Sequence, residues 1–216
     1  MKKLNLALLV AFIALAGVGF AADPNTIVNA DDALAMLKGG NSRFTGNLAN
    51  NEKSPTQARL ESINGQNPIA VVVTCADSRT APEIYFNKNL NRLFVVRTAG
   101  NVVDDIGLGS IEYAVKALGV RLVVVVGHQN CGAIKAAIAG GSIPPHINSF
   151  VNMIKPAVAT ARKESGDLLT NSIQANAIRV ADKIRHDGSL GADAKEVKVV
   201  PAVYSLETGK IHWLGN

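Results

Sequence analysis

The sequence predicts a single α/β domain with a mainly parallel central β-sheet flanked by helices. Three short apolar runs, at residues 69–73, 93–96 and 122–126, are rich in β-branched side chains and lack the alternation of a half-exposed strand. Such runs are typical of parallel strands that are covered on both faces. Segments with helical spacing of apolar residues separate and follow them, which favours an α/β architecture. With 216 residues, of which 48% are hydrophobic, the chain can bury one core.

The first predicted helix lies within residues 31–50. Asp31 or Asp32 can accept hydrogen bonds from the free N–H groups at its start. Gly39 and Gly40 predict its end, because glycine readily adopts the left-handed conformation that follows many helices.

The remaining elements follow in the order expected of this fold class. Apolar residues recur at helical spacing between the second and third strands, and an alanine-rich stretch follows the third. A long helical region, with Pro156 placed near a helix start, and a final hairpin complete the chain. The predicted ranges are helices at 109–118, at 132–139 and over most of 147–187, a strand at 197–204, a turn at 207–210 and a last strand at 211–214.

The first 21 residues have the pattern of a secretory signal peptide. Lys2 and Lys3 precede a run of apolar and small residues from Leu4 to Phe20, in which Asn5 is the one polar residue, and small residues at positions 19 and 21 suit a cleavage site. An uncleaved membrane anchor is the alternative, since the run is near the lower limit for spanning a bilayer. We predict a signal peptide at residues 1–21, a single domain at residues 22–216, and export to a bacterial periplasm.

The charge pattern gives no sign of a nucleic-acid partner. The formal net charge is +5, and the basic residues are spread along the chain rather than clustered or interleaved with aromatic residues. An ordinary solvated surface accounts for them. We expect no nucleic-acid partner, and no membrane contact once the signal peptide is removed.

Chemically reactive side chains follow two of the predicted strands. Cys75, Asp77 and Arg79 come directly after the first strand, and His128 and Cys131 follow the third. Ligands of open parallel sheets bind at the carboxyl ends of the strands. These side chains therefore converge at one edge of the sheet if the two strands are neighbours.

Two thiols, an imidazole and a carboxylate form a donor set that zinc accepts in tetrahedral geometry. Sulfur together with nitrogen favours zinc over magnesium or calcium. The candidate ligands of one zinc ion per chain are therefore Cys75, Asp77, His128 and Cys131. Three alternatives stay open: a disulfide between the two cysteines, a closed structural zinc site, and a redox thiol pair, which the lack of a Cys-x-x-Cys motif disfavours.

Arg79 favours a catalytic metal site over a structural one. Its guanidinium can hold the Asp77 carboxylate in a bidentate ion pair, which orients the carboxylate and lowers its pKa. Asp77 can then ligate the metal, or leave it and free a position for water. An exchangeable fourth ligand suits catalysis.

Four segments resemble the β-class carbonic anhydrases, in matching order along the chain. Residues 75–79, Cys-Ala-Asp-Ser-Arg, resemble the Cys-x-Asp-Ser-Arg signature of that family, and residues 127–132, Gly-His-Gln-Asn-Cys-Gly, resemble its Gly-His-x-x-Cys-Gly segment. Residues 93–101 resemble its Phe-Val-x-Arg-x-Ala-Gly-Asn stretch, and residues 110–114 resemble its Ser-Ile/Leu-Glu-Tyr-Ala helix. With weaker matches at the ends, the resemblance covers essentially all of residues 22–216.

The resemblance implies a zinc enzyme that interconverts carbon dioxide and bicarbonate through a zinc-bound hydroxide. It implies zinc ligation by Cys75, His128 and Cys131, with Asp77 and Arg79 as the catalytic pair. It also implies a homodimer or a homotetramer. Two rivals stay open: a zinc-bearing binding protein without turnover, and an enzyme for a related linear substrate such as carbon disulfide or carbonyl sulfide. The presence of both members of the catalytic pair argues against the first rival.

Overall fold

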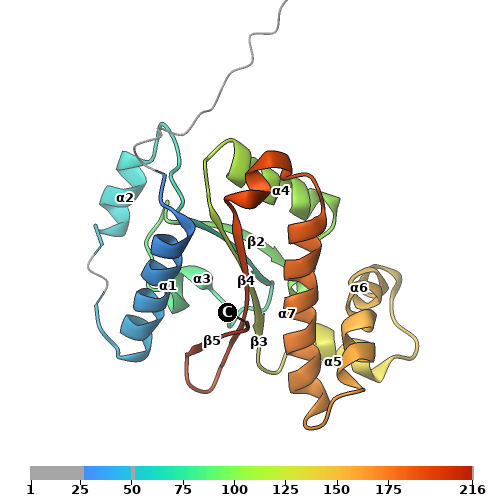
Figure 1. Ribbon diagram of the computed structural model, residues 1–216. Coiled ribbons are helices and arrows are strands. Elements are labelled where there is room, and N and C mark those ends of the chain that lie inside the picture. The colour runs from blue at the N-terminus through green and yellow to red at the C-terminus, as the bar shows by residue number, and fades with distance from the viewer. Residues whose placement is uncertain (1–26, 50–51, 216) are drawn as a thin grey trace, which may run out of the picture.

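The computed structural model describes residues 27–49 and 52–215, which form a five-stranded sheet with helices on both faces (Figure 1). The strand order is β2–β1–β3–β4–β5. The first four strands are parallel, and β5 runs antiparallel to β4. The predicted α/β class with a mainly parallel sheet is therefore confirmed. The strands are β1 (Ala70–Cys75), β2 (Leu93–Thr98), β3 (Leu122–His128), β4 (Lys198–Tyr204) and β5 (Ile211–Trp213).

The central strands β1 and β3 are buried at every position, as predicted for strands covered on both faces. Strand β2 differs: it lies at the edge of the sheet, and most of its residues are only half-buried. The prediction that all three runs are fully covered is wrong for β2. Its run of apolar residues resembles the other two, and the sequence alone does not show which strand has a neighbour on only one side.

One face of the sheet is covered by α1 (Ala30–Thr45) and α3 (Pro82–Tyr85), with α2 (Pro55–Glu61) further out (Figure 1). Side chains of alternate strand residues, such as Val72 and Val124, pack against this layer. Asn41 of α1 fixes the layer to the rest of the chain through three hydrogen bonds. Its side chain donates to the carbonyls of Tyr85 and Gly209 and accepts from the N–H of Ile211.

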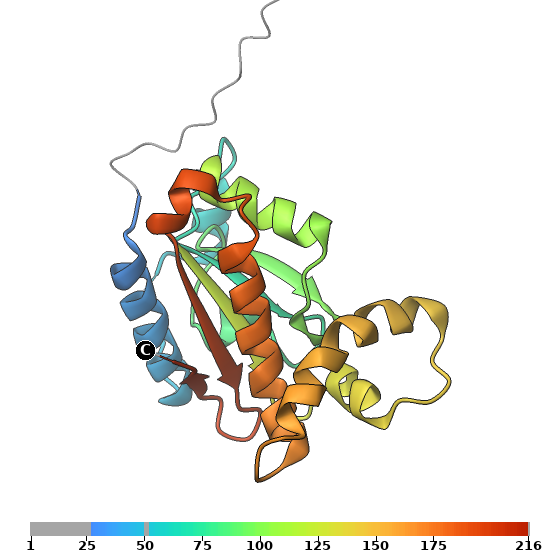
Figure 2. The same cartoon turned by 45° about the vertical axis from the view of Figure 1, so that its right-hand side comes forward.

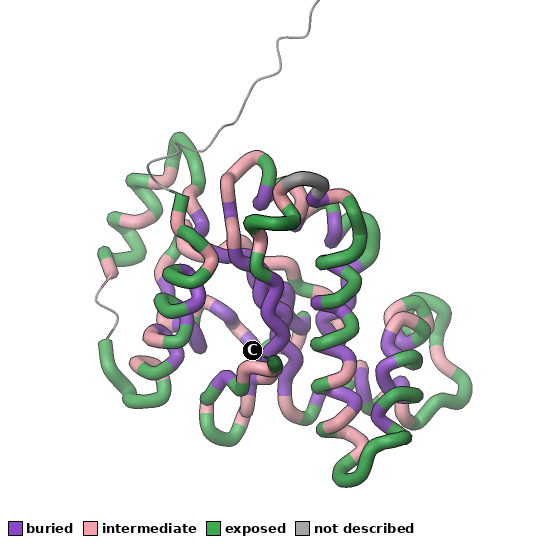
Figure 3. Tube along the Cα trace, viewed as in Figure 1, coloured by how far each residue is buried: buried purple, intermediate pink, exposed green. Residues whose placement is uncertain are grey.

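The opposite face of the sheet is covered by α4 (Asp105–Lys116) and α7 (Leu168–His186). Val71, Val73 and Val123 point to this side and pack against apolar residues of both helices. Figure 2 shows α7 lying along the sheet, and Figure 3 shows the buried strands between the two helical layers. Two packed faces explain the uninterrupted apolar runs of β1 and β3.

A third group of helices lies beyond the carboxyl ends of β1 and β3. It consists of α5 (Gly132–Ala139), α6 (Pro145–Ala161) and the short 3₁₀ turn η2 (Ala99–Asn101). A separate apolar cluster forms here, and it includes Cys75, Cys131 and Ile154. A second 3₁₀ segment, η3 (Gly191–Lys195), joins α7 to β4.

Two helix boundaries differ from the predicted ones. Helix α1 continues through Gly39 and Gly40 to Thr45, so the predicted stop is wrong. Pro156 lies inside α6 rather than near its start. Proline lacks an N–H to donate to the carbonyl four residues earlier, here that of Asn152. Both residues are exposed, so water can reach that carbonyl and reduce the cost.

The predicted signal peptide lies outside the described residues. Among the residues that the structure describes, no helix is both long and apolar enough to cross a membrane. The boundary between a signal peptide at 1–21 and a domain at 22–216 stays a prediction.

Candidate active site

The carboxyl ends of β1 and β3 bring three of the predicted metal ligands together. The two strands are parallel neighbours, and Cys75 and His128 are their last residues. Cys131 follows three residues after His128, at the N-terminal cap of α5. The sulfur atoms of the two cysteines and a ring nitrogen of His128 all lie within 4.8 Å of one another. The predicted convergence at this sheet edge is therefore present in the structure.

The side chain of His128 is fully buried and held in one orientation. Its Nδ1 lies 2.9 Å from the carbonyl oxygen of Gln129, which can only accept a hydrogen bond, so Nδ1 carries the proton. Nε2 then presents a lone pair, and it has no hydrogen-bond partner in the described part of the chain. A buried nitrogen without a partner is costly, and a metal ion would satisfy it. This arrangement is typical of a metal-bound histidine.

The two cysteines are free thiols, so the structure does not contain the alternative disulfide. A hydrogen bond from the Cys131 thiol holds the pKa of Cys75 below its usual range, although burial opposes this. The same hydrogen bond raises the pKa of Cys131, which therefore keeps its proton more tightly. Without metal, the pair thus favours one thiolate and one thiol. A soft divalent cation would favour deprotonation of both.

Asp77 and Arg79 form the bidentate pair expected from the sequence. Arg79 Nε donates to Asp77 Oδ1 at 2.9 Å, and its Nη2 donates to Oδ2 at 2.7 Å. The backbone N–H of Arg79 also donates to Oδ1. The Arg79 hydrogen bonds hold the pKa of the Asp77 carboxyl well below its usual range, so it is ionised at neutral pH.

The Asp77 carboxylate faces the metal-ligand group as well as Arg79. Its Oδ2 lies 3.8 Å from His128 Nε2, the nitrogen without a partner. Asp77 lies outside the three-residue group Cys75, His128 and Cys131, and both of its oxygens accept hydrogen bonds from Arg79. Direct ligation of the metal by Asp77 stays a prediction.

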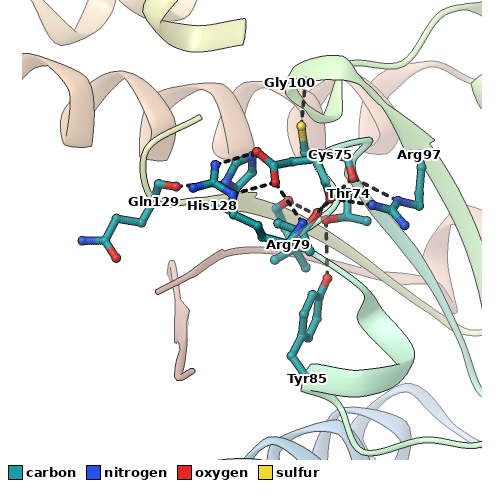
Figure 4. A network of polar contacts seen from close by, with 11 residues as sticks. Thr74, Cys75, Arg79, Tyr85, Arg97, Gly100, His128 and Gln129 are labelled. Atoms are coloured by element: carbon teal, nitrogen blue, oxygen red, sulfur yellow. Dashed lines mark hydrogen bonds and ion pairs between the residues drawn. The ribbon is translucent and has the colours of Figure 1, made fainter. Parts of the chain in front are cut away.

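The turn η2 also reaches the site, because the N–H of Gly100 donates to Cys75 Sγ at 3.3 Å (Figure 4). Gly100 has φ = +71°, a conformation that glycine adopts without steric cost. A Cβ atom at this position would lie 2.7 Å from Ile154 Cδ1 and 3.0 Å from Ala133 Cβ. The close approach of the backbone to the thiol therefore requires glycine.

Comparison with known proteins assigns this site to a family. A family model described as carbonic anhydrase matches residues 70–211, more than half of the chain. The chain belongs to the carbonic anhydrase family.

Similar proteins place it in the β class of that family, as predicted. Carbonic anhydrase 2 of Mycobacterium tuberculosis is 43% identical over 145 residues, which cover 65% of this chain and 69% of that protein. A Coccomyxa β-carbonic anhydrase solved with acetazolamide has a TM-score of 0.68 at 25% identity, covering 74% of this chain and 77% of that one. A Sordaria macrospora protein, one of two tetrameric β-carbonic anhydrases, shares the fold with a TM-score of 0.65 at 23% identity, covering 70% and 83%. Carbonic anhydrases are lyases, so the predicted enzyme class is confirmed.

Two residues that the sequence analysis did not single out hold the Cys75–Asp77 loop of this β-carbonic anhydrase. Arg97 donates from Nε to the carbonyl of Cys75 at 3.0 Å and from Nη2 to that of Asp77 at 2.7 Å. The buried hydroxyl of Thr80 lies 3.0 Å and 2.9 Å from the same two carbonyls. Arg97 lies within residues 93–101, which resemble the family, but that resemblance does not show which groups Arg97 contacts. The available signal was its position near the carboxyl end of β2, the edge where the site forms.

We expect Gly100→Ala to destabilise the protein by about 2–4 kcal/mol, because it combines a left-handed backbone conformation with overpacking. Urea unfolding of the purified protein measures the change. Gly188→Ala is the matched control, since Gly188 has φ = +84° and no atom within 4 Å of an added Cβ. The packing explanation is wrong if the two variants lose equal stability.

Proposed function

We propose that this chain is a zinc-dependent carbonic anhydrase that catalyses the reversible hydration of carbon dioxide to bicarbonate and a proton. Membership of the family supports carbon dioxide hydration. One observation carries the zinc dependence: two thiols and an unpartnered imidazole nitrogen meet within 4.8 Å, beside a carboxylate held by an arginine. The ligands would be Cys75, His128 and Cys131, with one zinc ion per chain.

The donor set fits zinc better than the other common divalent cations. Two sulfurs and one imidazole nitrogen suit a tetrahedral zinc site, and only three protein ligands leave the fourth position open for chemistry. Zinc bound there would supply a Lewis acid that makes water acidic enough to act as a nucleophile near neutral pH. The two thiolates would also balance the charge of the ion in a buried site.

The Asp77–Arg79 pair supplies the orientation that the reaction needs. The ionised Asp77 carboxylate can accept a hydrogen bond from the attacking oxygen, which directs a lone pair of that oxygen toward the carbon of carbon dioxide. Arg79 keeps the carboxylate charged and holds both of its oxygens, which would leave the fourth ligand position of a bound zinc ion free. Arg97 and Thr80 hold the backbone that carries Asp77, which limits its movement during turnover.

The oligomeric state and the location are part of the proposal. We propose a homodimer or homotetramer, which the tetrameric state of similar β-carbonic anhydrases supports. Large exposed apolar side chains, including Ile84 at 63% and Ile106 at 80% exposure, are consistent with subunit contacts. Export to a bacterial periplasm is supported by the signal-peptide pattern at residues 1–21. Light scattering and cell fractionation test these two points.

We expect purified protein to contain one zinc ion per chain and to accelerate carbon dioxide hydration in a stopped-flow assay. Removal of the metal with a chelator should abolish the activity, and added zinc should restore it. Metal analysis on the same sample links the two measurements. A protein that binds zinc without turnover would contradict the proposed activity, and full activity without bound metal would contradict the zinc dependence. Parallel assays with carbon disulfide and carbonyl sulfide test the related substrates.

A further inference from the structure

A buried asparagine on α7 makes a polar contact that the proposed mechanism does not use. Asn176 is 1% exposed, and it lies on the face of α7 that also carries the buried Ile173 and Val180. Its Nδ2 donates a hydrogen bond to the carbonyl oxygen of Gly100 at 2.8 Å, which joins residues 76 positions apart in the chain. The polar side chain therefore has a specific partner in the turn η2.

Burying the Asn176 amide costs stability, which indicates that its hydrogen bond to Gly100 has a function. Asn176 Oδ1 has no hydrogen-bond partner in the described part of the chain, although it is buried. An unpaired buried acceptor is unfavourable, and an apolar residue at this position would avoid it. The amide is thus retained at a cost to stability, and the bond to Gly100 is what it provides.

Gly100 connects this asparagine to the metal site. Its carbonyl accepts from Asn176, while its N–H donates to Cys75 Sγ at 3.3 Å. Glycine has no side chain with which to anchor itself, and its neighbours Ile154 and Ala133 restrict it only by packing. The Asn176 hydrogen bond is therefore a polar contact that holds the same peptide segment whose N–H reaches the sulfur.

We propose that Asn176 is a positioning residue of the zinc site, which acts by holding the Gly100 N–H on the Cys75 sulfur. The inference rests on the proposed function in that Cys75 is taken as a zinc ligand. A donor aimed at a metal-bound thiolate orients the sulfur and withdraws part of its negative charge. Such contacts around the ligands influence how tightly a metal is held. A helix that contributes no ligand thereby takes part in the metal site.

The test replaces Asn176 by leucine, which fills similar space without the amide, and by serine, which is too short to span the same contact. We expect both variants to release zinc to a chromophoric chelator about 10-fold faster than the wild type. With cobalt(II) in place of zinc, we expect the sulfur-to-cobalt charge-transfer band to shift. Thermal unfolding of the same samples reports stability separately, and the serine variant carries the test if the leucine variant does not fold.

Ser172→Ala is the matched control. Ser172 is fully buried on α7 one turn before Asn176, and its hydroxyl has no hydrogen-bond partner among the described residues. We expect this variant to release zinc within 2-fold of the wild-type rate and to keep the cobalt spectrum. Wild-type release and spectra in both Asn176 variants would overturn the inference, as would an equal effect of Ser172→Ala at a similar loss of stability. Neither readout requires turnover, so zinc-loaded protein without hydration activity would overturn only the proposed function.

Discussion

We expect Asp77→Asn to lower kcat for carbon dioxide hydration by roughly 10²–10³-fold while leaving zinc bound. The carboxylate makes two side-chain hydrogen bonds to Arg79, and both of its oxygens act as acceptors. In asparagine one oxygen becomes an NH₂ group, which cannot accept from the guanidinium. The charge is lost at the same time, so the side chain keeps at most one of its two side-chain bonds to Arg79 and becomes a much weaker acceptor for the attacking oxygen. Cys75, His128 and Cys131 are unchanged, so metal content should stay near one ion per chain.

Stopped-flow kinetics and metal analysis on the same preparation measure this effect. Asp182→Asn is the matched control, because Asp182 also pairs with an arginine, Arg185, three residues along an exposed helix surface. Exposed ion pairs contribute little, so this control should keep kcat within 2-fold. If zinc-loaded Asp77→Asn keeps more than half of the wild-type kcat, Asp77 has no role in the chemical step.

The sequence predicted the centre of the fold and the metal-ligand group for the same physical reason. A strand buried on both faces has to be apolar throughout, so β1 and β3 appear as unbroken apolar runs. The polar residues that directly follow such runs are then easily seen. Parallel strands end at a common edge, so the sequence alone predicts that Cys75 and His128 lie close together.

The support around the site could not be predicted in the same way. Asn176 and Arg97 act on backbone carbonyls, and any residue type provides a backbone carbonyl. Their partners therefore leave no pattern in the sequence. Asn176 is also isolated on a helix, 76 positions from Gly100. Only the packing of α7 against the sheet brings the two together.

The wrong end predicted for α1 has a different cause, which concerns two adjacent glycines. Glycine pairs commonly end helices, because glycine adopts left-handed conformations and lowers helix stability. Here Gly40 is buried inside α1, and a Cβ atom on it would lie 1.9 Å from the carbonyl oxygen of Phe86. The glycine allows α1 to approach the backbone at the end of α3. Tertiary packing thus outweighs the local tendency to stop.

We expect Gly40→Ala to destabilise the protein by about 3 kcal/mol or more, since the clash is with backbone rather than with a flexible side chain. Phe86 is fully buried and packs against Tyr85 and Trp213, so its carbonyl has little room to move. In a protein of this size the melting temperature should fall by about 6–12 °C. Calorimetry or thermal unfolding followed by circular dichroism measures the change.

The neighbouring glycine allows the same substitution to be tested without the clash. At Gly39 the nearest atom to an added Cβ is Arg43 Nη1 at 3.6 Å, an ordinary contact with the end of a flexible side chain. Alanine is a better helix former than glycine, so Gly39→Ala should stabilise the protein by about 0.5–1 kcal/mol. Two adjacent Gly→Ala changes in one helix should therefore shift the melting temperature in opposite directions. If both raise it, α1 does not approach Phe86 as closely as the structure shows, and if both lower it, the helix does not continue through this pair.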